Sequence, residues 1–572
     1  MSRLFSVSLA AVVVGSLGIG VFAQTPAENT SAPATVVQMP AASSAPTPTS
    51  FDQVLDRIVE REHFFVAEMR HMHPLVETYI QDLRPDHDLG AVPISDHYFL
   101  GRLDMSQGTQ DRAFVSPNNG LRKRMFEHLT SLYKMNFLPL GFAQMVILDD
   151  DFQKKNYNFT FVRREFIGEI RCLVIDVQPK PKTGNGRFIG RMWVEDQDYN
   201  IVRFNGTYGP DNRNSSYLHF DSWRLNMRPG VWLPAYIYSE ESDVKVRMTQ
   251  SLHYKAQTRL WGYDQRSFGR EDEYTSIQVD SETIKDQSQT AQDASPAEAQ
   301  RLWERQAEDN AVERLQKMGL LAPPGEVDKV LTTVVNNLIV TNNLEIQPDV
   351  RARVLLTTPL ESFTIGHTIV VSKGLLDVLP DEASLAMVLA RELGHIALGH
   401  QLDTSLAFND RMFFSDEDTF RTFTFKRSMK DEEEADQKAL ELLDKSPYKD
   451  KLGNAGLFLK ALQSRSPDLK NLIDARLGDG LVSGKTLRMS ALLNSAPQLD
   501  ERKKDQIAAL PLGGRVRVDP WSNQTELAKT KPVALVSARE KMPFEVTPVF
   551  PYLTRISTAN TEKVASTAPA AK

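Results

Sequence analysis

The segment from Asp381 to His400 contains the residues of this chain whose spacing best suits catalytic chemistry. Glu392 and His395 stand three residues apart, and Arg391 directly precedes the glutamate. Residues four apart share one face of a helix, so the side chains of Arg391 and His395 are expected on the same side of the helix. Two imidazoles at that spacing would hold zinc, with the intervening glutamate as general base for a metal-bound water. Here the first position of that HExxH pattern is an arginine, which has no lone pair to give a metal.

The surrounding residues predict two helices that would position this chemistry. Through the first segment, apolar side chains recur at helical intervals, at Leu385, Val388, Leu389 and Ile396. Further along, the run Asp-Glu-Glu-Glu-Ala-Asp at 431–436 places Glu432 and Asp436 four residues apart on one helix face. The sequence therefore predicts a buried motif helix and a second, acidic helix.

These segments occur in a specific order along the chain. The stretches at 353–366 and 369–377 come first, the motif helix follows, and the acidic run at 431–436 comes last. Together they resemble metallopeptidase family 48, the gluzincin zinc endopeptidases that include CAAX prenyl proteases and periplasmic chaperone-proteases. The resemblance covers about 320–445 and implies a mainly helical, gluzincin-type domain. It also implies that the strand near Phe363 pairs with an extended substrate as an added edge strand.

The resemblance assigns roles to several of the residues named above. It implies zinc as cofactor, with His395 and Glu432 as ligands and Glu392 as general base. Asp436 would orient His395 or pair with Arg391. His400 matches a histidine frequent in the family, but on a continuous helix it would lie about 140° around from His395. That angle predicts that His400 does not replace the missing ligand.

Two departures from the family pattern point to impaired zinc chemistry. Arg391 stays cationic at physiological pH and would repel a metal, which leaves two protein ligands where a catalytic zinc normally has three. We expect Arg391 to form a salt bridge with Glu432 instead. In addition, Ala496 occupies the place of the histidine in the family's "HP…R" segment, aligned on Pro497 and Arg502. These changes predict a pseudoprotease that binds polypeptide without cutting it.

Two alternatives stay open at this point. A working zinc endopeptidase would recruit another ligand, or a water, in place of the missing histidine. A lipid or lipoprotein carrier would use the peptidase fold only as a structural element. Zinc stoichiometry separates the first alternative from the pseudoprotease, and lipid co-purification would support the second.

The region before the peptidase-like segment has a different pattern. Helical spacing predicts helices over 51–83, with a break at Pro74, and over 121–135. After Tyr157 the apolar residues alternate, and the turns at 196–198 and 228–230 predict hairpins of an antiparallel sheet. The segments at 190–194, 202–203, 220–223 and 230–234 weakly resemble the half-barrel of outer-membrane lipoprotein carriers. That resemblance implies a concave face for lipid or a hydrophobic peptide, and an ordinary packed sheet is the alternative.

Composition limits the class of protein. The 572 residues include 41% hydrophobic and 25% charged residues, as in globular proteins. The 74 acidic and 67 basic residues give a net charge of −7, which argues against a nucleic-acid partner. Cys172 is the only cysteine, so a metal site must use histidines and carboxylates, and Cys172 itself is expected in the core.

The beginning of the chain predicts export. One arginine precedes an apolar run that ends at Ala23, as in a cleaved secretory signal, and an uncleaved anchor is the alternative. We therefore expect an exported, periplasmic or secreted α+β protein that binds polypeptide or envelope-protein clients. The predicted parts are a signal peptide (1–23), a disordered linker (24–50), an antiparallel half-barrel-like domain (51–265), a linker (266–295), a family-48-like domain (296–558) and a disordered tail (559–572).

Overall fold

The computed structural model describes residues 48–105, 110–113, 142–148, 152–183, 187–209, 218–247, 250–263, 296–400, 420–421, 423–484, 486–504, 506–528 and 541–556. The predicted signal peptide, the helix over 121–135 and the tail after 558 lie outside the described residues. The same holds for nearly all of both predicted linkers.

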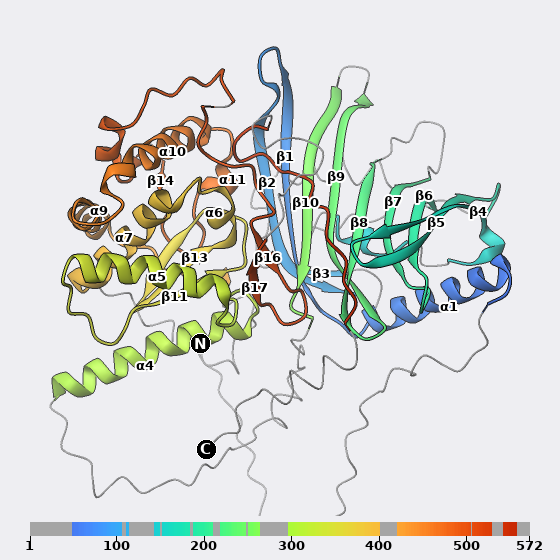
Figure 1. The fold of residues 1–572 in the computed structure, drawn as a ribbon, viewed down its shortest axis with the longest axis horizontal. Helices are drawn as coiled ribbons and strands as arrows, with labels where there is room; N and C mark the ends of the chain where they lie inside the picture. The colour runs from blue at the N-terminus through green and yellow to red at the C-terminus, as the bar shows by residue number, and fades with distance from the viewer. Residues whose placement is uncertain are drawn as a thin grey trace, which may run out of the picture. The chain divides into compact units, whose positions relative to one another are not determined.

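The first part of the described chain is dominated by strands (Figure 1). Its elements are α1 (Phe51–Met69), β1 (Leu75–Asp86), β2 (Gly90–Asp104), β3 (Gln110–Ala113), η1 (Ala143–Val146), η2 (Lys154–Asn156), β4 (Tyr157–Ile167), β5 (Ile170–Pro179), β6 (Phe188–Glu195), β7 (Ile201–Tyr208), β8 (Phe220–Arg228), β9 (Val231–Arg247) and β10 (Gln250–Trp261). The strands form one antiparallel sheet of ten, in the order β3-β2-β1-β10-β9-β8-β7-β6-β5-β4. Among the described residues the end strands β3 and β4 do not pair with each other, so the sheet is open.

Helix α1 packs on one face of this sheet. Ser50 caps it by accepting a hydrogen bond from the amide of Gln53, and the apolar side chains that were spaced for a helix, such as Ile58 and Phe65, are buried against strand residues. The predicted continuation of helical structure beyond Pro74 is wrong, because β1 follows there. Eight of the first nine residues of β1 are buried, so this central strand has no alternating pattern to identify it.

The second part of the described chain is mainly helical. Its elements are α4 (Pro296–Lys317), α5 (Glu326–Thr341), β11 (Arg351–Leu355), β12 (Ser362–Ile365), β13 (Thr368–Ser372), α6 (Lys373–Val378), α7 (Glu382–Leu398), α9 (Met429–Asp444), η5 (Lys449–Lys451), α10 (Leu452–Arg465), α11 (Lys470–Ile473), β14 (Val482–Ser483), β15 (Thr486–Leu487), η6 (Ser490–Asn494), β16 (Val516–Val518) and β17 (Thr525–Leu527). The predicted fold class, an antiparallel sheet followed by a mainly helical region, is confirmed. In the small sheet β11-β13-β12, strand β12 lies at an edge.

The two parts share buried contacts within residues 48–572. Strand and helical residues belong to one hydrophobic core, in which Cys172 is buried as expected. The carboxylate of Glu77 on β1 accepts hydrogen bonds from the amide and hydroxyl of Thr358, and Trp261 donates to the carbonyl of Gly319. A buried carboxylate needs such donors, so these contacts fix the sheet to the helical part. Among the described residues, no helix has both the length and the apolar character needed to cross a membrane.

Candidate functional site

The predicted motif helix is α7, and it is deeply buried. Asp381 caps its first turn by accepting from the amide of Ser384. The helix packs closely on α9, which carries the predicted ligand Glu432. Gly394 makes this possible, because a Cβ at that position would lie 2.9 Å from the carbonyl oxygen of Ala435 on α9. The close approach brings Arg391, whose side chain is fully buried, beside Glu432.

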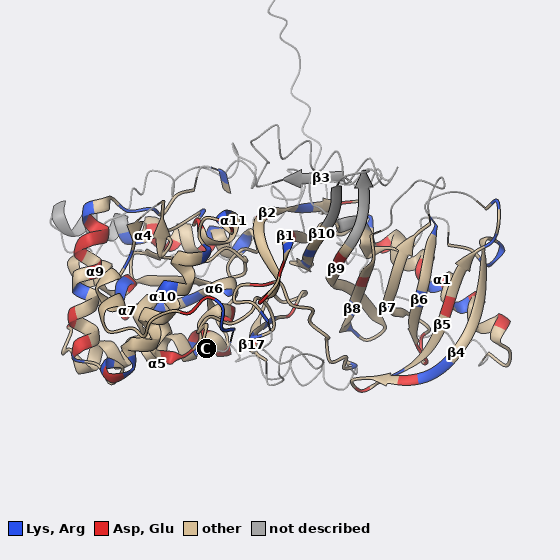
Figure 2. Ribbon diagram, turned by 90° about the horizontal axis from the view of Figure 1, so that it is seen from above, with Lys and Arg blue, Asp and Glu red and all other residues tan. Residues whose placement is uncertain are grey.

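Arg391 is surrounded by carboxylates. Its Nη1 atom lies 3.2 Å from Oε1 of Glu392, and its Nη2 atom donates a short hydrogen bond to Oε2 of Glu432. Its Nε atom lies 3.4 Å from Oδ1 of Asp436. The salt bridge expected between Arg391 and Glu432 is therefore present, and Asp436 pairs with the same guanidinium. Figure 2 shows the acidic residues of α9, the helix that supplies two of these three carboxylates.

His395 and Glu432 retain the relationship that the family resemblance implies. His395 Nε2 lies 3.4 Å from Oε1 of Glu432, and neither atom has a hydrogen-bond partner among the described residues. Ligand atoms about 2.0–2.1 Å from a tetrahedral zinc lie roughly 3.3–3.5 Å apart, so this pair has ligand-like spacing. The place of a third ligand, however, is taken by the Arg391 guanidinium, which is already hydrogen-bonded to Glu432. A cation without a lone pair does not fit a zinc ion there.

Five further residues complete the site, and the sequence patterns assigned a role to none of them. Ser362 on β12 donates to Oε1 of Glu392 at 2.7 Å, and Arg488 Nε lies 3.5 Å from Oε2 of Glu432. Arg427 donates to Thr364, and its amide donates to Asp479. Ser362 and Thr364 lie on β12, within the stretch at 353–366. Arg427, Asp479 and Arg488 come from segments later in the chain that have no motif of their own.

Within the described residues, the segment aligned to the family's "HP…R" pattern is placed away from the buried carboxylates. Arg502 is exposed, and Ala496 packs beside Gly456 of α10. The arginine that approaches the buried carboxylates is Arg488, which is 4% exposed. The loop that reaches the site therefore lies earlier in the chain than the segment aligned on Pro497 and Arg502.

The charges of the site determine its protonation. Burial acts to raise the pKa of Glu432, but His395 and Arg391 outweigh it, and this pKa lies well below its usual range. Burial and the neighbouring charges of Glu432 and Glu392 raise the pKa of Asp479 to about 8. The pKa of Asp436 is also raised, mainly by burial. These surroundings favour the protonated form of Asp479 and the charged form of Glu432.

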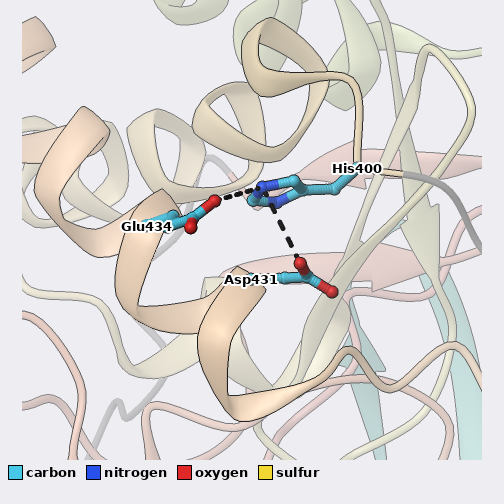
Figure 3. Close-up of side chains that lie close together, drawn as sticks. All are labelled: His400, Asp431 and Glu434. Atoms are coloured by element: carbon cyan, nitrogen blue, oxygen red, sulfur yellow. Dashed lines mark hydrogen bonds and ion pairs between the residues drawn. The ribbon is translucent and has the colours of Figure 1, made fainter.

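His400 lies beyond the end of α7, which terminates at Gly399 in the left-handed conformation (φ 69°). The 140° expected for a continuous helix does not apply, since the chain turns back after Gly399. His400 Nδ1 comes within 3.0 Å of His395 Nδ1. Its Nε2 atom points instead toward Glu434 and Asp431 (Figure 3). His400 thus contacts a predicted ligand but presents its outer nitrogen to other carboxylates.

One protein-family model matches the region that contains α7. Residues 327–415 match the sequence model of peptidase family M48. The match confirms the predicted resemblance for this family-M48 region, which includes Arg391, Glu392, His395 and His400. No curated protein matches the chain.

Solved structures similar to this chain fall in its N-terminal part. One is a LolA superfamily protein from Nitrosomonas europaea, with 12% identity, a TM-score of 0.20, and coverage of 38% of this chain and 93% of that one. Another is a putative outer-membrane lipoprotein-sorting protein domain from Vibrio parahaemolyticus, with 10% identity, a TM-score of 0.20, and coverage of 36% and 90%. Both belong to the class of protein that the N-terminal sequence resembles.

Proposed function

We propose that this chain is an exported polypeptide-binding protein whose family-M48 region does not hydrolyse peptides with zinc. The observation that carries the proposal is the position of the Arg391 guanidinium among the carboxylates of Glu392, Glu432 and Asp436. A cation already occupies the place where the resemblance puts a metal. The apolar segment that ends at Ala23 supports export.

The electrostatics of the pocket support a stable metal-free state. Removing zinc from a buried site would leave two carboxylates and a histidine without a counter-charge, at a high desolvation cost. Arg391 supplies that charge permanently, and Arg488 approaches the same Glu432 oxygen. Hydrogen bonds from Arg391 and Ser362 also engage the Glu392 carboxylate, which diminishes its availability as a general base.

The edge strand β12 supports a role in binding extended polypeptide. The amide and carbonyl of Ser362 face away from β13 and pair with Asp479 of the same chain, at 3.3 and 3.2 Å. Backbone groups at a sheet edge bind an extended chain in this manner. The segment at 476–480 thus occupies the start of this edge, and a client that uses the whole edge has to displace it.

Zinc analysis with matched variants tests the proposal. Zinc in the pocket is defined as zinc that is lost when Glu432→Gln is introduced, because that change removes a ligand charge with little change in shape. We expect no Glu432-dependent zinc in the natural protein. We expect about one equivalent in the Arg391→His variant, since this restores three protein ligands. Arg488→His is the control, because it adds an imidazole near Glu432 from a loop and not from α7.

The unpaired His395 and Glu432 atoms favour one alternative, a zinc peptidase with a rearranged ligand set. Stoichiometric, Glu432-dependent zinc in the natural protein, together with cleavage of an unfolded protein, would establish that alternative and end the proposal. A lipid or lipoprotein carrier would instead be indicated by lipid that co-purifies with the chain.

A further inference from the structure

Three metal-ligating side chains converge outside the arginine pocket. His400 follows the end of α7, while Asp431 and Glu434 lie in the first turns of α9 (Figure 3). His400 Nε2 is 3.4 Å from Oε2 of Glu434 and 4.0 Å from Oδ1 of Asp431. All three ligand atoms lie within 4.8 Å of one another. We propose that they form a second site, which binds a divalent transition-metal ion of the zinc class.

The separations suit a small ion. Around a tetrahedral zinc with ligands at about 2.0–2.1 Å, neighbouring ligand atoms are roughly 3.3–3.5 Å apart. The His400–Glu434 separation already has this value, and the separation to Asp431, whose side chain is 33% exposed, is longer at 4.0 Å. Three protein ligands leave a fourth position for water. One imidazole with two carboxylates favours zinc, cobalt or nickel over magnesium or calcium, which prefer oxygen ligands only.

His400 is held in the orientation that a metal ligand needs. Its side chain is 8% exposed, and its Nδ1 atom faces His395 Nδ1 at 3.0 Å. A proton on Nδ1 of His400, donated to His395, leaves the lone pair on Nε2 free for a metal. The carbonyl oxygen of His400 accepts a 2.6 Å hydrogen bond from Arg427, which fixes the backbone of this turn.

The two carboxylates use their other oxygens elsewhere. Oδ2 of Asp431 accepts a hydrogen bond from the hydroxyl of Ser428, and Oε1 of Glu434 lies 3.6 Å from the exposed Lys430. The oxygens that face His400 are therefore the ones available to a metal. Two negative charges with a neutral imidazole also balance a divalent ion.

This site is distinct from the arginine pocket. Glu432 points into the pocket and pairs with Arg391, whereas Asp431 and Glu434 lie on another face of α9 and are 33% and 47% exposed. Among the described residues, the two sites are linked by the His395–His400 contact and by Arg427, which donates to the carbonyl of His400. An ion bound to His400 would connect the end of α7 to the first turns of α9 without entering the pocket.

Zinc titration of the full chain against a chromophoric chelator tests this inference. We expect Glu434→Gln and Asp431→Asn each to weaken zinc binding by about tenfold or more, as loss of a charged ligand does. Glu433→Gln removes the same charge from the exposed neighbouring residue and should change the affinity less than about twofold. Zinc should also raise the unfolding temperature of the natural protein but not that of Glu434→Gln.

Two outcomes would overturn the inference. One is zinc affinity that is equal in the natural protein and in Glu434→Gln. The other is zinc binding that Glu432→Gln abolishes and Glu434→Gln leaves intact, which would place the metal in the arginine pocket. The first outcome leaves the proposed function standing, and the second contradicts both, so the two failures can be told apart.

Discussion

Arg391 and Glu432 form a buried ion pair at the position where the family-M48 resemblance places a zinc ion and one of its ligands. Both side chains are at most 2% exposed. The pair joins the motif helix α7 to α9, and the guanidinium also approaches Glu392 and Asp436. The arginine therefore has a structural role in linking the two helices.

This role predicts a large loss of stability for Arg391→Met. The change leaves three buried or half-buried carboxylates without their cation, and breaking such a pair costs about 3–5 kcal/mol. Urea unfolding measures the loss, and adding Glu432→Gln should recover part of it. Arg351→Met is the control, since Arg351 pairs with Asp309 where both side chains are more than half exposed, and it should cost about 1 kcal/mol or less. Equal losses for the two arginines would contradict the buried role.

A second prediction concerns pH. Because the folded protein raises the pKa of Asp479 to about 8, this carboxyl binds a proton more tightly folded than unfolded. Its contribution to stability is therefore complete below its unfolded pKa and is lost as the pH rises toward 8. The slope is at most about 1.4 kcal/mol per pH unit. Asp479→Asn mimics the neutral acid and should lessen the fall in unfolding free energy between pH 5 and 8.

Glu432 titrates in the opposite sense, which provides a check on this experiment. Its lowered pKa means that its contribution is present above its unfolded pKa and is lost as the pH falls through the acid range. Glu432 is present in both proteins, so its titration affects both. The unfolding free energies of the natural protein and of Asp479→Asn should differ near pH 8, where Asp479 ionises, and converge near pH 4, where Asp479 is protonated. A constant difference across the range would show that Asp479 does not titrate in this window.

Local patterns predicted the centre of the site but not its surroundings. Spacing of four residues on single helices was enough to place Arg391 with His395 and Glu432 with Asp436, because helix geometry fixes those relationships. Ser362 and Arg488 reach the same carboxylates through tertiary contacts, which no local pattern encodes.

The errors in the prediction of the fold have physical causes as well. Residue spacing does not identify β1 as a strand, because most of its first nine residues are buried and the pattern does not alternate. The angle of 140° assumes a helix that continues through Gly399, whereas α7 ends at Leu398. A glycine after a helical run often forms a left-handed cap, so the sequence contains a signal for the C-terminal end of α7 at Gly399.

The segment at 476–480 approaches β12 so closely that position 478 has no room for a side chain. A Cβ at this glycine would lie 2.3 Å from Cδ1 of Phe363, and that ring is stacked on Phe425 at 4.7 Å. Gly478→Ala should therefore cost about 1–3 kcal/mol by overpacking and loosen the Ser362–Asp479 pairing. Hydrogen exchange at the Ser362 amide should become faster. Gly453→Ala in α10, where the nearest atom is 3.4 Å away, is the control and should leave stability unchanged or raise it.

The last prediction concerns how α1 is held on the large sheet. Glu62 of α1 accepts two hydrogen bonds from the guanidinium of Arg224 on β8, at 2.7 and 2.8 Å, and both side chains are at most 2% exposed. Glu62→Gln leaves the arginine charge buried without its counter-ion, so we expect a loss of about 3–5 kcal/mol in unfolding free energy. The ring of Phe65 lies 3.7 Å from the same guanidinium and cannot compensate a full charge.

Glu60→Gln is the matched control for this pair. Glu60 lies on the same helix and pairs with Arg57, but its side chain is 70% exposed, so the change should cost less than about 1 kcal/mol. Hydrogen exchange should show α1 opening before the sheet in Glu62→Gln, because the pair links this helix to β8. If both variants lost the same small amount, α1 would be held by its apolar face alone, through residues such as Ile58 and Met69.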